Sequence, residues 1–290
     1  MLFREPYLSR RAAFAMLGAA GLSVASKARS APAATGLVSV TGAKLFYQDS
    51  GGTGVPLIML HAFTGSAFSW DAYQRTAFTK AGLRVISYSR RGFRGSEVEP
   101  GSPAGSAIDD LDAVADSVGV KRFHLLGTAG GGFILPDYAL SRPERVRSMI
   151  MACTQGGCIE PSFVAALDRM LPAEFKKMPP AFRELAPAYR ALNPEGTAAW
   201  EAMERTSKVT ERIVQAPRNR IDFAALSRIR VPTLVIAGDA DLYIPPALAR
   251  QYAAQIPKSE FAVIQESGHS AFWEQPAQFN RLVGNFVRRF

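Results

Sequence analysis

The chain holds two kinds of side chain near its C-terminus that could move protons. One is the imidazole of His269, and the other is a carboxylate in the segment GDADLYIP, either Asp239 or Asp241. The chain has only three histidines. His124 falls inside an apolar run that predicts a buried strand, whereas His269 stands in the segment ESGHSAF, directly after another predicted strand. An imidazole held by a carboxylate is suited to general base catalysis, so His269 is the candidate base.

The segment LLGTAGGGF, residues 125–133, has the pattern of a sharp turn between a strand and a helix. In the motif G-x-S-x-G a serine at this turn attacks a carbonyl group, but here the position holds Ala129. Because a methyl group cannot form an acyl-enzyme, covalent catalysis through residue 129 is excluded. Thr128 and Cys153 are weaker substitutes: the side chain of Thr128 should leave the turn in another direction, and Cys153 belongs to a different strand.

Short apolar runs alternate with segments of helical periodicity along most of the chain, which predicts an α/β protein. Unalternating strands separated by helices indicate a mostly parallel central sheet with helices on both faces. Residues 156–225 interrupt this pattern with many prolines and no strand signal, so we expect a helical insertion in a core formed by residues 34–155 and 226–290. The predicted strands are 37–40, 44–47, 55–60, 85–88, 123–126, 146–152, 232–237 and 261–264, and the main predicted core helices are 70–81, 108–118 and 276–290.

Four motifs follow predicted strands, at the edge of a parallel sheet where ligands bind. They are HAFTGS (61–66), the elbow at 127–131, GDADLYIP (238–245) and SGHSAFWEQP (267–276). Their order and spacing resemble the α/β-hydrolase fold family, as does SRRGFRGS (89–96), over about residues 36–290. The resemblance implies that Asp241 orients His269, that residues 156–225 form a cap, and that the lineage hydrolyses esters, lactones or related carbonyl compounds.

The same resemblance implies an oxyanion hole, in which backbone N–H groups stabilise a developing negative oxygen. Its donors would be the amides of Phe63 and Gly130, which do not depend on the missing serine. We expect a small, largely apolar carbonyl compound in the capped pocket. The residues expected to form the pocket wall are His61, Phe68, Tyr243 and Phe272, although a histidine in the position of His61 more often serves as a structural hydrogen-bonding group.

Three functions remain open. His269 could act as a general base on substrate or water without a covalent step, as in a lyase, an isomerase-like enzyme or a slow hydrolase. The protein could instead be a catalytically inactive relative that binds a ligand or partner, or a serine hydrolase in which serine was replaced at Ala129 by engineering. No metal or organic cofactor is expected, because GTAGGG lacks the G-x-G-x-x-G spacing and no metal-ligand cluster occurs. The expected partner is a small molecule, and the oligomeric state is open.

The N-terminus predicts export. Arg10 and Arg11 precede a mildly apolar stretch, and Ala31-Pro32-Ala33 offers small residues where a signal peptidase needs them. The paired arginines resemble a twin-arginine signal, so we expect residues 1–33 to be cleaved from a periplasmic or secreted protein with no stable membrane span. Residues 1–33 contribute +4 to the net charge of +9, and no basic run occurs, so nucleic-acid binding is not expected.

The two cysteines, Cys153 and Cys158, allow two interpretations. In an oxidising compartment they could form a local disulfide. Alternatively, one is a core residue at a strand end and the other a free thiol in a loop. Without a matching pair of histidines they make a poor zinc site.

Overall fold

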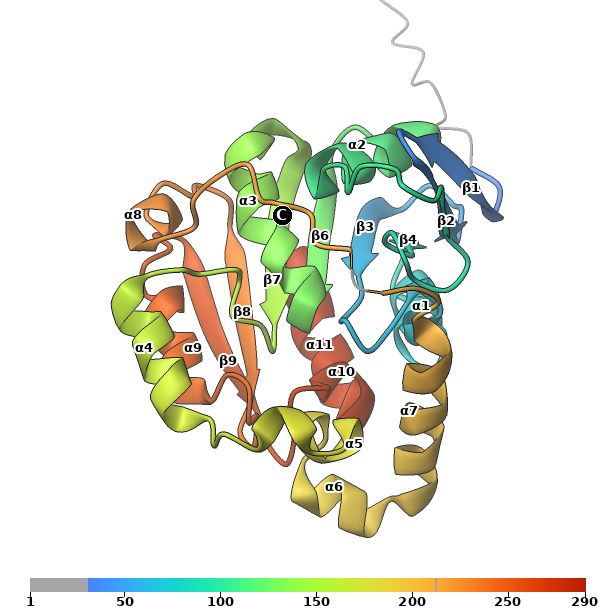
Figure 1. Ribbon diagram of the computed structural model, residues 1–290. Helices are drawn as coiled ribbons and strands as arrows, with labels where there is room; N and C mark the ends of the chain where they lie inside the picture. Colours follow the sequence, from blue (N-terminus) through green and yellow to red (C-terminus); the bar gives the residue numbers. More distant parts are fainter. Residues whose placement is uncertain (1–30, 212) are drawn as a thin grey trace, which may run out of the picture.

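The computed structural model describes residues 31–211 and 213–290, and its centre is a nine-stranded sheet (Figure 1). Strands β3, β4, β6, β7, β8 and β9 form the middle and one edge of the sheet, and they pair with one another in parallel. Strands β1 and β2 form a hairpin at the other edge, with antiparallel pairing. This confirms the predicted fold class. In spatial order the strands are β1 (Ala34–Val40), β2 (Ala43–Asp49), β4 (Leu83–Tyr88), β3 (Val55–Leu60), β6 (Phe123–Thr128), β7 (Val146–Ala152), β8 (Thr233–Gly238) and β9 (Ser259–Ile264), with the short β5 (Glu97–Val98) paired to β2.

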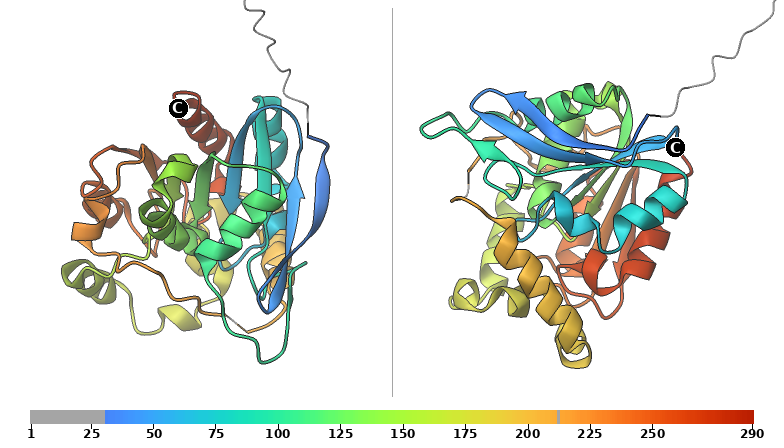
Figure 2. Two further views of the ribbon diagram at one scale, coloured as in Figure 1. Left: turned by 90° about the horizontal axis from the view of Figure 1, so that it is seen from above. Right: turned by 90° about the vertical axis from the view of Figure 1, so that its right-hand side faces the viewer.

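Helices cover both faces of the sheet, as the two views of Figure 2 show. Side chains alternate along a strand, so Ile58 and Leu60 join one hydrophobic cluster while Leu57 and Met59 join the other. The first cluster packs against α2 (Ala107–Ser117), α3 (Ile134–Ser141), α4 (Pro161–Met170), α8 (Phe223–Leu226) and α9 (Pro246–Ala253). The second packs against η1 (Ala67–Trp70), α1 (Gln74–Lys80), α10 (Ala271–Glu274) and α11 (Pro276–Val287).

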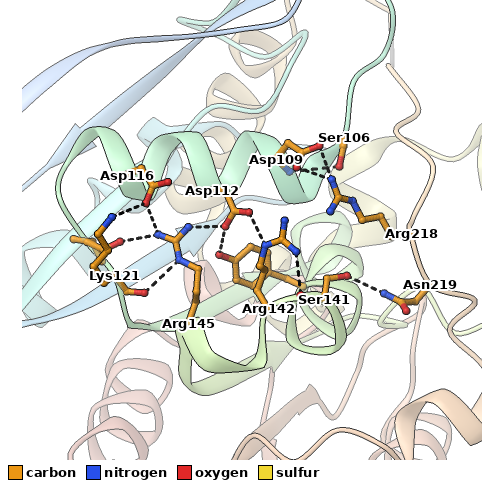
Figure 3. A network of polar contacts seen from close by, with 12 residues as sticks. Ser106, Asp109, Asp112, Asp116, Lys121, Ser141, Arg142, Arg145, Arg218 and Asn219 are labelled. Atoms are coloured by element: carbon orange, nitrogen blue, oxygen red, sulfur yellow. Dashed lines mark hydrogen bonds and ion pairs between the residues drawn. The ribbon is translucent and has the colours of Figure 1, made fainter.

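A polar network holds α3 against α2 (Figure 3). Asp112 on α2 accepts hydrogen bonds from the hydroxyl of Tyr138 at 2.7 Å, from Nε of Arg142 at 2.9 Å and from Nη1 of Arg145 at 2.7 Å. A network with a shared, partly buried acceptor constrains geometry more than an isolated surface pair does. The network therefore positions the helix that follows the glycine-rich turn at 127–131.

The insertion between β7 and β8 is helical. It contains α4, η4 (Phe175–Lys177), α5 (Pro180–Glu184), α6 (Pro187–Leu192), α7 (Pro194–Ser207) and the start of α8. Helices α4 to α7 each begin with proline, which is tolerated there because the first N–H groups of a helix have no partner within the helix. The prolines that interrupt the sequence pattern thus mark helix starts. Helices α5, α6 and α7 lie beyond the carboxyl ends of the strands (Figure 1).

Of the predicted export signal, residues 1–30 lie outside the described residues. The described chain opens with Ala31, whose N–H and C=O groups bond to the backbone of Gly52 at 3.3 and 2.8 Å. Within residues 31–211 and 213–290, no helix is both long and apolar enough to cross a membrane.

Both cysteines are free, so the disulfide alternative is wrong. Cys153 and Cys158 are buried in the two different hydrophobic clusters. The second interpretation is confirmed: Cys153 is a core residue at the end of β7, and Cys158 is a free thiol in the loop that follows, where it is buried as well.

Candidate active site

The turn after β6 has a strained backbone at Ala129. Its φ of +46° lies in the left-handed region, which costs an L-residue with a Cβ atom about 1–2 kcal/mol. Surrounding hydrogen bonds hold it there: the Ala129 N–H donates to the carbonyl of Cys153 at 3.2 Å, and the hydroxyl of Thr154 donates to the Ala129 carbonyl at 2.7 Å. Such strain concentrates at functional sites. The turn thus keeps the geometry that would present a nucleophile, although residue 129 has none.

The glycines of this turn let neighbouring backbone approach closely. A Cβ atom at Gly131 would collide with the carbonyls of Leu60 and His61, and one at Gly130 would collide with the ring of Phe63. Bulkier residues at either position would push away the loop that follows β3. The glycines therefore allow the ring of Phe63 to pack directly against Gly130, while the oxyanion hole expected from the amides of these two residues stays a prediction.

His269 and Asp241 are in contact at the carboxyl ends of β9 and β8. Nδ1 of His269 lies 2.9 Å from Oδ1 and 2.8 Å from Oδ2 of Asp241. Oδ1 also accepts hydrogen bonds from the backbone N–H groups of Tyr243 at 2.8 Å and Ile244 at 3.0 Å. The carboxylate accepts a hydrogen bond from the Nδ1–H group, so in the neutral imidazole the lone pair lies on Nε2. The competing Asp239 is exposed and accepts instead from a backbone N–H in the loop before His269.

Burial lowers the pKa of His269, but the carboxylate of Asp241 outweighs burial, and the net pKa is raised above the ordinary 6.5. Charge attraction and the hydrogen bond from Nδ1 both act in this direction, with smaller contributions from Glu184 and Glu274. A raised pKa means that Nε2 binds a proton more strongly than a free imidazole does. The pair is therefore built to accept a proton.

His269 and Ala129 share a cavity of about 500 Å³. The insertion supplies much of its wall, including five charged side chains. The aromatic wall expected from the sequence is present in Phe63 and Tyr243, and the insertion adds charged side chains that were not expected. The residues that line the cavity are Phe63, Thr64, Ala129, Gly130, Phe133, Gln155, Leu171, Phe175, Lys176, Arg183, Glu184, Glu204, Lys208, Tyr243 and His269.

The insertion is bonded directly to the loop that carries His269. The carbonyl of Glu184, at the end of α5, accepts hydrogen bonds from the N–H groups of His269 at 2.7 Å and Ser270 at 3.1 Å. A Cβ atom at Gly268 would lie 2.7 Å from that same carbonyl oxygen, so only glycine allows this approach. The end of α5 and the histidine loop consequently form one unit.

A buried carboxyl group, Glu274, reinforces this junction. Its two oxygens accept hydrogen bonds from the N–H of Gly268 at 2.9 Å and the N–H of Ala186 at 2.6 Å. Burial raises the pKa of Glu274 to about 7, even though these hydrogen bonds favour the charged form. Glu274 thus links the histidine loop to the residues that join α5 and α6.

Of the residues predicted to form the pocket wall, Tyr243 lines the cavity, with its ring centroid 4.4 Å from that of His269. The prediction that His61 forms part of the pocket wall is wrong. Its Nδ1 lies 2.7 Å from the carbonyl of Ala62, and its Nε2 accepts the backbone N–H of Arg90 at 3.1 Å. His61 is a structural hydrogen-bonding group within the loop after β3.

The same prediction is wrong for Phe68 and Phe272, which do not line the cavity. Phe68 stacks on Phe46 with ring centroids 4.9 Å apart, and the guanidinium of Arg94 lies 4.5 Å from its ring. Phe272 is buried against Trp70, at 5.1 Å between centroids. Both follow site loops in the sequence, but Phe68 on η1 is partly exposed between Phe46 and Arg94, and Phe272 on α10 is buried in the core.

Neither alternative nucleophile is placed for attack. Thr128 is buried at the end of β6 and is not part of the cavity wall formed by the described residues. Cys153 has its Sγ 3.7 Å from the carbonyl of Gly268, and burial raises the pKa of its thiol well above the ordinary value. A thiol kept protonated in this way is a poor nucleophile.

The charged wall of the cavity could not be identified from sequence motifs. Lys176, Arg183, Glu184, Glu204 and Lys208 all belong to the insertion, where no motif marks them. The one available signal was that an insertion after a central strand must cover the carboxyl ends of its neighbours. That signal identifies the segment but not the side chains that face inward.

Comparison with known proteins agrees with this geometry. The chain is 28% identical over 273 residues to a 2-hydroxy-6-oxononadienedioate/2-hydroxy-6-oxononatrienedioate hydrolase of Burkholderia vietnamiensis (strain G4 / LMG 22486), covering 86% of this chain and 92% of that protein. It resembles the structure of a thermophilic esterase from Thermogutta terrifontis, with a TM-score of 0.71, 25% identity and coverage of 89% and 99% of the two chains. It also resembles Est816, an N-acyl homoserine lactone degrading enzyme, with a TM-score of 0.71, 27% identity and coverage of 87% and 100%.

The alpha/beta hydrolase family matches residues 57–282, which include the glycine-rich turn, Asp241 and His269. Most of the chain lies within this match. The chain therefore belongs to the alpha/beta hydrolase family.

Proposed function

We propose that this protein is an enzyme that removes a proton from a small carbonyl compound, with His269 as general base and no covalent intermediate. The observation that carries the proposal is the His269–Asp241 pair, which stands in a cavity whose nucleophile position is Ala129. A base with a raised pKa and an orienting carboxylate supports a catalytic role, and such a base does not need serine to act on an acidic C–H or on water.

The proposed reaction begins when the substrate carbonyl enters the cavity beside Phe63 and Gly130. Their backbone N–H groups act as the oxyanion hole and stabilise negative charge on the carbonyl oxygen. Nε2 of His269 takes a proton from the neighbouring carbon, and Asp241 stabilises the imidazolium. The insertion, residues 156–225, acts as a cap that limits the access of water.

The relatives support a carbonyl substrate. Their names describe hydrolysis of an oxo-dioate, an ester or a homoserine lactone, each of which contains a carbonyl group. In this chain Lys176, Arg183 and Lys208 line the cavity. These cations favour a substrate that also bears a carboxylate, so 2-oxopentanoate is the first probe and uncharged 2-pentanone is its matched comparison.

Exchange of substrate hydrogen for deuterium tests this function and predicts a pH dependence. In D₂O, proton NMR should show loss of the C3 hydrogens of 2-oxopentanoate in the presence of the enzyme. Protonated His269 cannot accept a proton, so kcat/KM should fall with decreasing pH, with a midpoint above the ordinary 6.5 of histidine because the pKa of His269 is raised. Binding of the probe without exchange at any pH would instead favour a ligand-binding protein.

We also propose that the protein is exported by a twin-arginine route, on the basis of Arg10, Arg11 and the small residues before Ala34. In a host with that route, mature protein should be recovered outside the cytoplasm with the mass of a chain that begins near Ala34. Replacing Arg10 and Arg11 by lysine should leave full-length protein in the cytoplasm. Recovery of exported protein that keeps residues 1–33 contradicts the cleaved signal.

A further inference from the structure

The insertion places a carboxyl group beside the proposed base. Glu184 ends α5, is buried, and lines the same cavity as His269 and Ala129. Its position relative to the base is set by backbone hydrogen bonds, because its own carbonyl accepts the N–H groups of His269 and Ser270. A change in the position of the histidine loop would therefore move Glu184 with it. This coupling is what an acid–base pair requires.

The carboxyl group of Glu184 is weakly bonded within the protein. Among the described residues its hydrogen-bonding partner is the hydroxyl of Ser270, at 3.4 Å, which is longer than usual for an O–H···O bond. A buried structural carboxylate normally accepts several short hydrogen bonds, as Glu274 does at the same junction. The carboxyl of Glu184 thus keeps hydrogen-bonding capacity that faces the cavity.

The surroundings of Glu184 raise the pKa of its carboxyl group above the ordinary value. Burial raises the pKa of the carboxyl, and the negative charge of Asp241 adds to this, whereas His269 and Arg183 act in the opposite direction. The charged and titratable groups that face it are Arg183 from its own helix, His269 from the loop after β9, Asp241 and Tyr243 from the loop after β8, and Lys176, Glu204 and Lys208 from the rest of the cavity wall.

We propose that Glu184 is a second catalytic residue of this site, a general acid that donates its proton to the substrate oxygen while His269 removes a proton from carbon. This inference rests on the proposed function and names the reaction as enolisation of a ketone. It gives the insertion a chemical role in addition to covering the cavity.

The step balances without a co-reactant. The C–H bond next to the carbonyl breaks, its proton moves to Nε2 of His269, and its electron pair forms the C=C bond. The π electrons of the carbonyl move to oxygen, which takes the proton of Glu184 and becomes an enol hydroxyl. The site then holds an imidazolium beside a carboxylate, two opposite charges that stabilise each other at short range. Reversal returns both protons, and in D₂O the carbon receives deuterium.

The test compares wild-type protein with Glu184→Gln in the exchange of 2-oxopentanoate hydrogens in D₂O. Glutamine keeps the shape and can accept the Ser270 hydrogen bond, but it cannot donate a proton as an acid. We expect the exchange kcat to fall about 100-fold, the usual scale for loss of a general acid. Glu195→Gln changes an exposed carboxylate at the start of α7 and should stay within about twofold of wild type, because Glu195 lies outside the cavity wall.

A second readout separates an acid from a structural residue. In the Ala129→Ser background, hydrolysis of p-nitrophenyl acetate releases a phenolate, which leaves without help from an acid. The loss of this hydrolysis rate on Glu184→Gln should therefore be at least about tenfold smaller than the loss of the exchange rate. Equal losses in the two assays would mean that Glu184 only supports the site, and exchange that survives Glu184→Gln would also overturn the proposal. Absence of exchange in wild type, or exchange indifferent to His269→Ala, contradicts the proposed function itself, and the role of Glu184 falls with it.

Discussion

Ala129→Ser should convert this protein into an esterase that hydrolyses p-nitrophenyl acetate at least about 100-fold faster than the parent chain. The strained turn is already formed, residue 129 faces the cavity, and His269 is oriented by Asp241. The substitution adds the one atom that the acyl-transfer mechanism lacks. The rate is measured by release of p-nitrophenolate, and mass spectrometry of fluorophosphonate-treated protein should place the label on residue 129.

The control for this gain is the double variant Ala129→Ser with His269→Ala. It should lose the ester hydrolysis, because serine without a base is a weak nucleophile at neutral pH. Circular dichroism of each variant checks that the fold is retained. A folded Ala129→Ser protein that neither hydrolyses the ester nor takes the label would show that His269 is not positioned to activate a side chain at residue 129.

His269→Ala should reduce the exchange of 2-oxopentanoate hydrogens by about 1,000-fold, within the range that a general base contributes. The variant keeps the cavity and the cationic side chains but removes the group that accepts the proton. Exchange is followed by proton NMR under saturating probe, so that an effect on kcat is separated from one on binding. Asp241→Asn should reduce the exchange rate by a smaller factor, because the imidazole is still present. This variant loses only the carboxylate that orients the ring and stabilises its protonated form.

His124→Gln is the matched control. His124 is buried in β6, its Nδ1 lies 2.8 Å from the hydroxyl of Ser148, and burial lowers its pKa to about 4. It is therefore a neutral core residue remote from the proton transfer. This variant should exchange within about twofold of wild type, as expected for a change outside the site. A similar loss in both histidine variants would indicate general damage to the fold and contradict a specific role for His269.

The sequence predicted the sheet and the loops of the site because these depend on local patterns. A short apolar run such as 55–60 or 146–152 has few alternatives to a buried strand, and both agree with β3 and β7. The pairing of His269 with Asp241 follows from the order of the loops around a parallel sheet. Helix boundaries were less accurate: residues 70–81 were expected as one helix, but η1 ends at Trp70 and α1 begins at Gln74.

The lining of the cavity could not be predicted because it depends on how distant segments dock. Phe68 and Phe272 stand close in sequence to site loops, yet each packs on an aromatic ring away from the cavity, Phe46 or Trp70. Glu184 is held at the cavity by hydrogen bonds between its carbonyl and the histidine loop, some 85 residues further along the chain. The residues next to Glu184 in the sequence do not reveal this distant contact. Amphipathic periodicity indicates that a helix in the insertion has an inner face, but not which part of the core that face meets.

In the proposed function, this site keeps a working base without a nucleophile. The decisive quantity is the ratio of deuterium incorporation into 2-oxopentanoate by wild-type protein and by His269→Ala, at the same protein concentration and at a pH above the midpoint of the wild-type profile. We expect a ratio of about 1,000, the scale of general base catalysis. A ratio near one, with both proteins folded and binding the probe, would contradict the account.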